Sequence, residues 1–383
     1  MQVFDDQTFA ILVLMCLILM FFTTPAVMAL YKPARKPVPY KTRKLEGIDK
    51  KDQLRILACV HGTTRNTTAL LNLVEACKGT TTSGTRLKPQ VKLFAMHLIE
   101  LSLDRPSSIL SLSRSVTAEQ DEIVQAMAHD DDNTLIPFKT YGQISKVPVR
   151  LLQAVSQLSD MHHDICESAV EKRATMILLP CNVQLKEHGT LEHINLGLKA
   201  MNERVMENAP CSVAVLLDKG QWGSAQLSVE TDIKVGVVFR GGSDDREALA
   251  FGCRLAGHTN VKVWILRFKP NEASHVINIT RDDCEEHDLD EQTLVDIREN
   301  NVNKNNIIYE ECPYNTLDSY PKDVVASTKV NDFSLIVVGH GQYSNSEKSE
   351  LGHVGEALAK ISSGGTKASI LVIQQHKKEQ TNA

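Results

Sequence analysis

The sequence lacks closely spaced cysteines, and its body has no concentration of basic residues. Its nine cysteines form no CxxC pair, and three of them, Cys59, Cys211 and Cys253, lie in or beside apolar runs. Such scattered cysteines are typical of reduced, buried thiols and argue against a disulfide framework or a zinc site. The net charge of −5, without a long basic stripe interleaved with aromatic residues, argues against a nucleic-acid-binding protein.

The histidines are equally scattered, and no set of them predicts a metal site. His162 and His163 with Glu167 are the nearest candidate ligands, but adjacent residues of a helix point about 100° apart. His61 and His340 each end a predicted strand, where α/β enzymes often place catalytic residues. No G-x-S-x-G sequence accompanies them, and the spacing assigns no acid–base partner. We therefore expect neither a metal ion nor enzymatic activity.

The glycine-rich turn in VVFRGGSDDREALAFG, residues 237–252, also lacks the residues of a phosphate site. A strand followed by such a turn and a helix is how many α/β proteins bind phosphate. Here there is no GxGxxG and no lysine followed by a hydroxyl residue, and the carboxylates of Asp245 and Glu247 would repel a phosphate. We interpret the stretch as a structural turn with two glycines and one helix-capping residue: Gly241, Gly242, and either Ser243 or Asp244.

A second glycine-rich stretch, GHGQYSNSEKSELGHVG at residues 339–355, does not fit a nucleotide motif either. Gly339 and Gly341 are too close together for the G-x2-G-x9-G-[S/T] spacing of ATP-binding universal stress proteins. The corresponding loop in the first half of the chain, PCNVQLKEHGT, contains one glycine, Gly189. We expect no cofactor and assign no cofactor-binding residue.

A long apolar run is present near the amino terminus, from Phe9 to Leu30. Its 22 residues carry no charge, and at about 1.5 Å of rise per residue they would cross a hydrocarbon core of about 30 Å. Asp5 and Asp6 precede the run. Six basic residues follow it without an intervening acid: Lys32, Arg35, Lys36, Lys41, Arg43 and Lys44. By the positive-inside rule, the part of the chain after the run is expected in the cytosol.

The alternative for this run is a cleaved signal peptide, with Val27-Met28-Ala29 as the cleavage site. A signal peptide has a basic start and a shorter apolar core, whereas this run is long and its start is acidic. We therefore expect a retained transmembrane helix. The sequons at Asn66 and Asn278 would then never meet the glycosylation machinery.

After a linker rich in proline and lysine, the sequence alternates β-rich runs with helical patterns, and it does so twice. The first five expected strands are residues 55–62, 92–101, 135–141, 176–181 and 212–217. The second five are residues 233–239, 261–266, 307–311, 334–340 and 369–375. Residues 149–173 are expected to be helical. Near-continuous apolar strands separated by helices are typical of a parallel sheet covered on both faces.

The predicted organisation is therefore an α/β fold with two tandem parallel-sheet domains after one transmembrane helix. The predicted parts are a transmembrane segment at 1–31, a basic linker at 32–53, a first domain at 54–218 and a second at 233–377. The seam between the domains, DKGQWGSAQLSVETD at 218–232, is polar and contains glycine, as a boundary should.

Several stretches resemble the plant cation/H⁺ exchanger family. DQTFAILVLM and FFTTPAVMALYKPARK are similar to its last transmembrane helix and the exit into the cytosol. LRILACVHGTTRNTTALLNLVEACKGT, AMHLIELSLDRPSS and VVFRGGSDDREALA resemble successive blocks of its cytosolic tail. The resemblance covers nearly the whole chain in order. It implies two universal-stress-like, Rossmann-like domains that regulate a monovalent cation/proton antiporter, with K⁺ as the expected cation.

Members of that family carry a bundle of transmembrane helices with acidic ion-binding residues, whereas here we expect only the last helix. The apolar run holds no ionisable residue that could carry a cation or a proton. We expect a fragment or a truncated product that acts as a regulatory tail. Its expected partners are a lipid bilayer through residues 9–30 and, by the resemblance, the antiporter's transmembrane bundle or a second tail. A membrane-tethered nucleotide-binding stress sensor and a scaffold stay open as alternatives.

Overall fold

The computed structural model divides the chain into two compact units, Met1–Lys41 and Thr42–Ala383. The structure describes residues 6–30, 43–48, 52–61, 65–79, 90–101, 133–181, 183–185, 191–193, 195–225, 232–270, 281–301, 306–314, 320–326, 332–341, 349–360 and 368–377.

The first unit contains one described helix, α1 (Asp6–Leu30). Its apolar side chains from Phe9 to Phe22 are exposed. Among the residues that the structure describes, no helix reaches the length and apolarity that a membrane crossing requires. Residues Phe9 to Leu30 are helical, as expected, but a membrane-spanning helix is not shown, and that part of the expectation stays a prediction.

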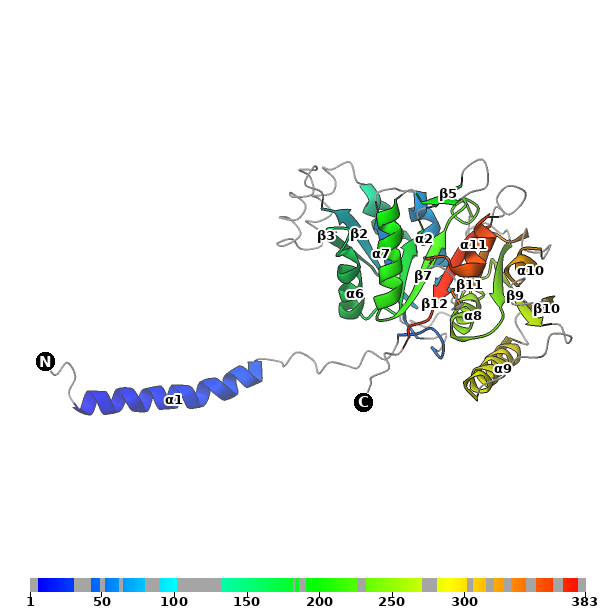
Figure 1. The fold of residues 1–383 in the computed structure, drawn as a ribbon. Helices are drawn as coiled ribbons and strands as arrows, with labels where there is room; N and C mark the ends of the chain where they lie inside the picture. Colours follow the sequence, from blue (N-terminus) through cyan, green and yellow to red (C-terminus); the bar gives the residue numbers. More distant parts are fainter. Residues whose placement is uncertain are drawn as a thin grey trace. The chain divides into compact units, whose positions relative to one another are not determined.

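The second unit is built on one ten-stranded sheet of mixed, mostly parallel pairing (Figure 1). The first half of the chain contributes β1 (Leu54–His61), β2 (Val91–Glu100), β3 (Val149–Ser156), β4 (Met176–Pro180) and β7 (Ser212–Leu217). The second half contributes β8 (Ile233–Phe239), β9 (Val261–Pro270), β10 (Ile307–Tyr314), β11 (Leu335–Gly339) and β12 (Ser369–Gln374). A separate two-stranded ribbon is formed by β5 (Val183–Leu185) and β6 (Leu191–His193).

The two halves have the same strand order. The sheet runs β10-β9-β8-β11-β12-β7-β4-β1-β2-β3, so that each half places its third, second, first, fourth and fifth strands side by side in that sequence. Pairing is parallel within each half, and the two fifth strands, β12 and β7, pair antiparallel. The two similar halves are therefore related by an approximate two-fold axis that passes between β7 and β12.

Helices cover both faces of this sheet. One core cluster consists of buried side chains from one face of the sheet and from four helices: α2 (Arg65–Lys78), α5 (Ile136–Ser145), α8 (Ser243–Leu255) and α9 (Arg281–Asn301). The remaining helices are α6 (Met161–Lys172), α7 (Leu196–Asn208), α10 (Tyr320–Ala326) and α11 (Gly352–Lys360). Of these, α6 packs against α7 and α10 against α11. The nearly continuous burial of β4, β7 and β11 confirms the expected two-sided cover.

One predicted strand was wrong. Residues 135–141 were expected to form the third strand of the first half, but residues 136–145 form α5, whose first turn contains Pro137, where the missing N–H costs no helical bond. The third strand is β3, which was expected to be helical. It lies at the edge of the sheet, and only Leu151 and Ala154 are buried in it. Their spacing of three residues is that of a helix face, so the sequence pattern was misleading.

The predicted seam at 218–232 is described from Asp218 to Ala225, and this part is fixed against α2. Trp222 is fully buried, and its Nε1 donates to the carbonyl of Ala69 at 3.1 Å. Asn72 Nδ2 donates to the carbonyl oxygens of Trp222 and Ala225 at 2.9 and 3.0 Å. Because one sheet runs through both halves, the division into two domains at this seam stays a prediction.

Candidate functional site

The turn between β8 and α8 lies where many α/β folds bind a ligand. Strand β8 has β9 on one side and β11 on the other, so its carboxyl end is a topological switch point of the sheet. The turn residues Arg240 to Gly242 follow this end, and α8 begins at Ser243. The geometry of this turn therefore decides whether the second half offers a phosphate site.

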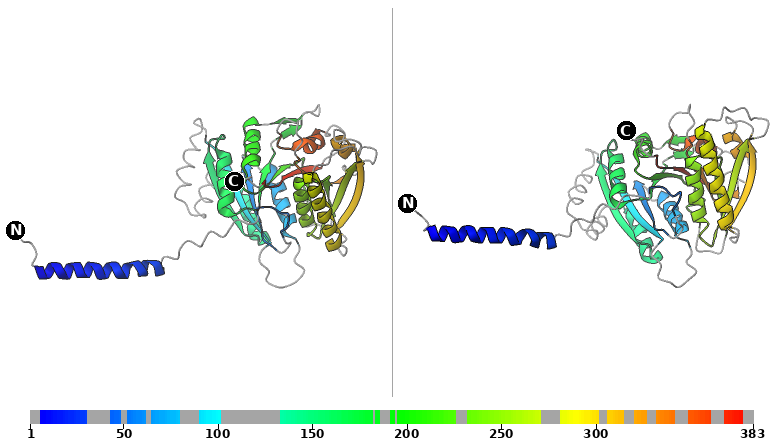
Figure 2. Two further views of the ribbon diagram at one scale, coloured as in Figure 1. Left: turned by 60° about the horizontal axis from the view of Figure 1, so that its bottom comes forward. Right: turned by 90° about the horizontal axis from the view of Figure 1, so that it is seen from below.

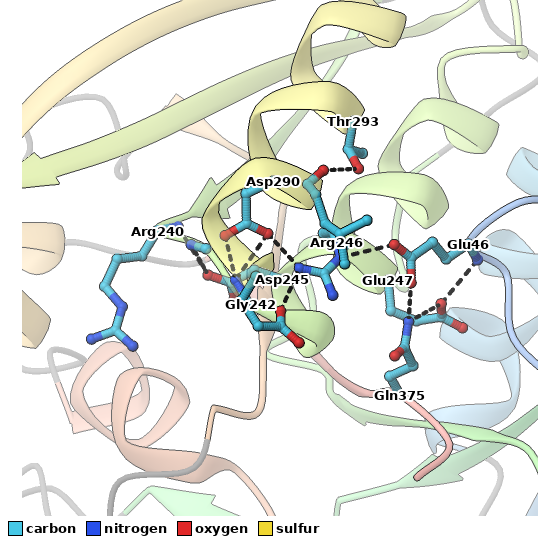
Figure 3. Close-up of polar contacts among 12 residues, drawn as sticks. Glu46, Arg240, Gly242, Asp245, Arg246, Glu247, Asp290, Thr293 and Gln375 are labelled. Carbon is cyan, nitrogen blue, oxygen red and sulfur yellow. Dashed lines mark hydrogen bonds and ion pairs between the residues drawn. The ribbon is translucent and has the colours of Figure 1, made fainter. Parts of the chain in front are cut away.

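Carboxylates of the chain itself accept the backbone N–H groups of this turn (Figure 3). The N–H groups of Arg240 and Gly241 donate to Asp245 Oδ2 at 2.8 and 3.0 Å. The N–H of Gly242 donates to Asp290 of α9, with 2.9 Å to Oδ2. A phosphate bound at this turn would compete with these carboxylates for the same N–H groups. Their internal partners support the interpretation of a structural turn.

The two glycines are required by the backbone of the turn. Gly241 has φ 140° and Gly242 has φ 99°, which lie in the region that favours glycine. A Cβ at Gly241 would also lie 2.5 Å from Asp290 Oδ2, whereas a Cβ at Gly242 would meet nothing within 4 Å. The predicted roles of both glycines are confirmed.

The predicted helix cap was wrong. The N-cap of α8 is Gly242, and no side chain makes a capping hydrogen bond there. Asp244 instead accepts the N–H of Gly341, which follows β11, and the N–H of Gln375, which follows β12, at 3.1 and 2.8 Å. Its carboxylate therefore connects the carboxyl ends of three neighbouring strands.

Burial also affects the protonation of the Asp245 carboxyl group. It raises the pKa of Asp245 to about 6, and the N–H groups of Gly241 and Arg240 oppose this shift because they stabilise the ionised form. Asp245 is the acceptor that closes the turn, so its charge varies in the range of pH that cells use.

Arg246 joins three elements from a buried position. It is 3% exposed, and its guanidinium pairs with Glu46 at 2.8 Å and with Glu286 and Asp290 of α9 at 2.7 and 2.6 Å. Helices α8 and α9 lie side by side (Figure 2). The next residue, Glu247, is fully buried and accepts the N–H groups of Leu45 and Glu46. The first turn of α8 thus holds both α9 and residues 43–48.

A second buried polar cluster links the two halves on other elements. The carboxylate of Glu350, just before α11, accepts the thiol of Cys181 at 3.0 Å and Asn202 Nδ2 of α7 at 2.7 Å. All three residues are nearly inaccessible to solvent. Burial raises the pKa of Glu350, with the hydrogen bonds from Asn202 and Cys181 opposing it. Burial, with the Glu350 charge adding to it, also raises the pKa of Cys181, so this thiol is not reactive.

The histidine candidates are not assembled into a site. The rings of His162 and His163 have centroids 4.0 Å apart and are tilted by 38°. Burial, with the charge of His163 adding to it, lowers the pKa of His162. Over the described residues, no group of three or more potential ligands could hold a metal ion. His61 and His340 belong to β1 and to the end of β11, and three strands separate these in the sheet. Gly189 and Asn278 lie outside the described residues.

Sequence reasoning missed Glu46, Arg246 and Gln375 as members of the site. The sequence signal was present in SDDRE, where four charged residues begin a helix whose following residues are apolar. Charges so close to a buried face need partners. Glu46, the partner of Arg246, lies 200 residues away in the sequence, and Gln375, a partner of Asp244, lies 131 residues away. No local sequence pattern identifies such distant partners.

Comparison with known proteins agrees with the resemblance found in the sequence. Residues 93–221 match the model of the plant cation/H(+) antiporter domain, and residues 232–374 match that of the plant cation/H(+) antiporter, C-terminal domain. The chain belongs to the plant cation/H⁺ antiporter family. Cation/H(+) antiporter 19 of Arabidopsis thaliana is 36% identical over 388 residues, covering 97% of this chain and 46% of that protein. Cation/H(+) antiporter 20 of the same plant is 37% identical over 432 residues, covering 98% of this chain and 49% of that protein.

This member of the family spans about half the length of the curated relatives it matches. Its fold is similar to that of a universal stress protein from Archaeoglobus fulgidus, at a TM-score of 0.50 and 12% identity, covering 85% of this chain and 98% of that one. The predicted α/β fold of universal-stress type is therefore confirmed. The antiporter relatives are transporters, and the expectation that this chain has no enzymatic activity stays a prediction.

Proposed function

We propose that this chain is the cytosolic regulatory part of a monovalent cation/proton antiporter that acts in cation and pH homeostasis, with K⁺ as the cation. The observation that carries the proposal is the match to antiporter relatives over 97% of the chain. The matched part contains an α/β body in which the buried charged residues Arg246 and Glu350 have internal partners.

The body is attached to the membrane by α1 in this proposal. The uncharged run from Phe9 to Leu30 supports it, as do the acids before the run and the basic residues after it. Protease added to sealed vesicles with the cytosolic face outward should digest the body and leave a membrane-protected fragment that contains α1. Glycosylation at Asn66 would contradict this orientation.

A chimera tests the regulatory role. This chain replaces the matching part of Cation/H(+) antiporter 19, and K⁺-driven proton flux is measured in sealed vesicles over a range of cytosolic pH. The comparison is with the same antiporter from which that part is deleted. We expect the chimera to restore a pH dependence that the deletion abolishes. Equal flux and equal pH dependence in the two proteins would contradict the proposal.

Liposomes that contain this chain alone serve as the control. Transport requires an ionisable group near the membrane midplane between opposed helices. The apolar run of α1 offers no such group. We therefore expect no K⁺-driven pH change from the chain alone. A change that survives purification would contradict a purely regulatory role.

The stress-sensor alternative is less well supported by the second half. A nucleotide phosphate at the β8–α8 turn would have to displace Asp245 and Asp290 from the N–H groups of Arg240 to Gly242. The negative charges of these carboxylates would oppose it at the same place. A regulatory module that works through internal contacts agrees better with this geometry.

A further inference from the structure

Basic side chains gather at one edge of the sheet in the first half. Arg55 and Lys92 are the second residues of β1 and β2 and pair in register, so they lie on the same face of the sheet at the amino ends of these strands. Phe94, two residues after Lys92, lies on this face too and pairs with Arg150, the second residue of β3. Three neighbouring strands therefore each place one cation on this face.

Helix α6 adds a fourth cation, and we call the four residues Arg55, Lys92, Arg150 and Lys172 the basic patch. The carbonyl of Lys172, the last residue of α6, accepts Arg55 Nη1 at 3.4 Å. Lys92 Nζ lies 5.1 Å from the centre of the Phe94 ring. Burial lowers the pKa of Lys92, with the charges of Arg150, Arg55 and Lys172 adding to it. The four charges are therefore close enough to repel one another.

Acidic partners are few at the basic patch. Glu171 pairs with Lys172 at 2.6 Å, and no other acid in the described part of the chain forms an ion pair with the patch. Arg150 is exposed, and Arg55 and Lys92 are half-buried. An anion from outside the chain can therefore contact the patch and supply the missing counter-charge.

The second half repeats the basic pair but neutralises it. Lys234 and Lys262 pair at the start of β8 and β9, as the first two residues of the patch do in β1 and β2. Here Asp232 pairs with Lys262 Nζ at 2.5 Å, and Ile308 of β10 stands where β3 has Arg150. The fold therefore does not require an exposed group of cations at this position, and the second half provides a matched control.

The chain enters the body at the same edge as the basic patch. The carbonyl of Arg43 accepts the N–H of Ser212, the first residue of β7, at 3.0 Å. Strand β7 runs parallel to the three strands of the patch, so their amino ends share one edge of the sheet. Helix α1 ends at Leu30, and the 12 residues 31–42 can span at most about 40 Å. A membrane that contains α1 would therefore lie within this span of the edge.

We propose that the basic patch binds the phosphate groups of anionic lipids and holds the first half of the body against the membrane surface. This inference goes beyond the proposed function and rests on it only in placing α1 in the membrane. Each basic residue near an anionic leaflet strengthens attachment by about fivefold. The guanidinium groups of Arg55 and Arg150 can in addition donate two hydrogen bonds each to a phosphate.

The second half presents acids at the same edge, which limits the contact to the first half. Helix α9 carries the exposed side chains of Glu286 and Asp288, and Glu286 pairs with Arg246 in the first turn of α8. This turn follows the carboxyl end of β8, which lies at the edge of the patch because the halves pair antiparallel. An anionic membrane would repel these acids.

Amine footprinting of the full chain in nanodiscs tests the basic patch. Nanodiscs of phosphatidylcholine alone are compared with nanodiscs that contain about 30% phosphatidylserine, an anionic lipid. Acylation of Lys92 is followed by mass spectrometry. We expect Lys92 to react at least about fivefold more slowly in the anionic nanodiscs, which is the effect of one basic residue at the leaflet. This protection should vanish in about 0.5 M salt.

Lys262 is the internal control, since it should react equally in both kinds of nanodisc. Equal reaction of Lys92 in both would overturn the proposal. Protection of Lys92 by inorganic phosphate in the neutral nanodiscs would assign the patch to a free anion and overturn the lipid surface as its partner.

Matched variants assign the protection to the patch. Arg55→Gln combined with Arg150→Gln should remove most of the protection of Lys92. Lys234→Gln combined with Lys262→Gln loses the same charge from the second half and should keep the protection. Equal protection in the two double variants would overturn the proposal. Arg150→Gln alone changes one exposed side chain and should reduce the protection even if the double variant does not fold.

Retention of the chain in the neutral nanodiscs tests the membrane attachment of the proposed function separately. Retention without protection of Lys92 in the anionic nanodiscs would overturn the basic patch alone. Protection on the anionic nanodiscs without retention in the neutral ones would support the patch and contradict the attachment through α1.

Discussion

The two halves of the body share a strand order but differ at the turn after their first strand. In the second half, the first turn of α8 carries Asp244, Asp245 and the neighbouring Arg246 and Glu247. In the first half, α2 begins with RNTT and has no acid in its first turn. The same topology therefore carries an acidic, buried junction in one half and a junction without acids in the other.

Burial makes the difference larger. In α8 the side chains of Asp244, Arg246, Glu247 and Arg254 are at most 9% exposed, whereas in α2 the only buried polar side chain among the described ones is Thr67. Arg254 Nη2 also reaches the carbonyl oxygens of Asp52 and Gln90, at 3.2 and 2.9 Å, in the first half. Helix α8 therefore connects the two halves, α9 and residues 43–48. The lesson is that a repeated fold can concentrate its internal connections in one copy.

The largest expected effect follows from removing the buried guanidinium of α8. Arg246→Ala leaves Glu46, Glu286 and Asp290 close together without their counter-charge. We expect a loss of roughly 3–5 kcal/mol of unfolding free energy, the usual cost of breaking a buried ion pair on one side. Urea unfolding followed by circular dichroism measures it.

The matched change in the other half is Thr67→Ala on α2. Thr67 is 2% exposed and its Oγ1 makes no hydrogen bond with the described part of the chain. We expect a change within about 1 kcal/mol. Equal effects of the two substitutions would show that the junction at α8 contributes no more to stability than its counterpart at α2.

The next largest effect is a pH dependence carried by Asp245. Its folded-state pKa, about 6, lies above the ordinary value, so its stabilisation is complete below about pH 4 and is lost as pH rises through 6. Relative to Asp245→Asn, the wild type should lose about 2 kcal/mol of stability between pH 4 and pH 7. Parallel stability curves for the two proteins would contradict a raised pKa of Asp245.

The smallest expected effect separates the two glycines of the turn. Gly241→Ala adds both an unfavourable φ and a contact of 2.5 Å with Asp290, while Gly242→Ala adds only an unfavourable φ. We expect Gly241→Ala to be more destabilising by about 1–2 kcal/mol. If Gly242→Ala were the worse variant, the closure of the turn by Asp290 would be wrong.

The sequence predicts the alternating elements and the repeat because their cores consist of continuous apolar strands, as in MILLP and SVAVLL. It does not predict β3, because an edge strand with two buried residues has no clear period of two. The two glycines of the turn follow from local chemistry. The partners of Asp244 and Glu247 do not follow from local chemistry. Gln375 and Leu45 reach these carboxylates only through the pairing of β12 with β7 and the path of residues 43–48.

The role of the acidic turn is tested most directly by calorimetric titration of the full chain with Mg²⁺ and ATP. If Asp245 and Asp290 close the turn of the second half, the turn offers no free N–H group to a phosphate. We predict no binding in the micromolar range by the wild type. Micromolar binding that Gly241→Val abolishes would contradict the account and restore the second half as a nucleotide sensor.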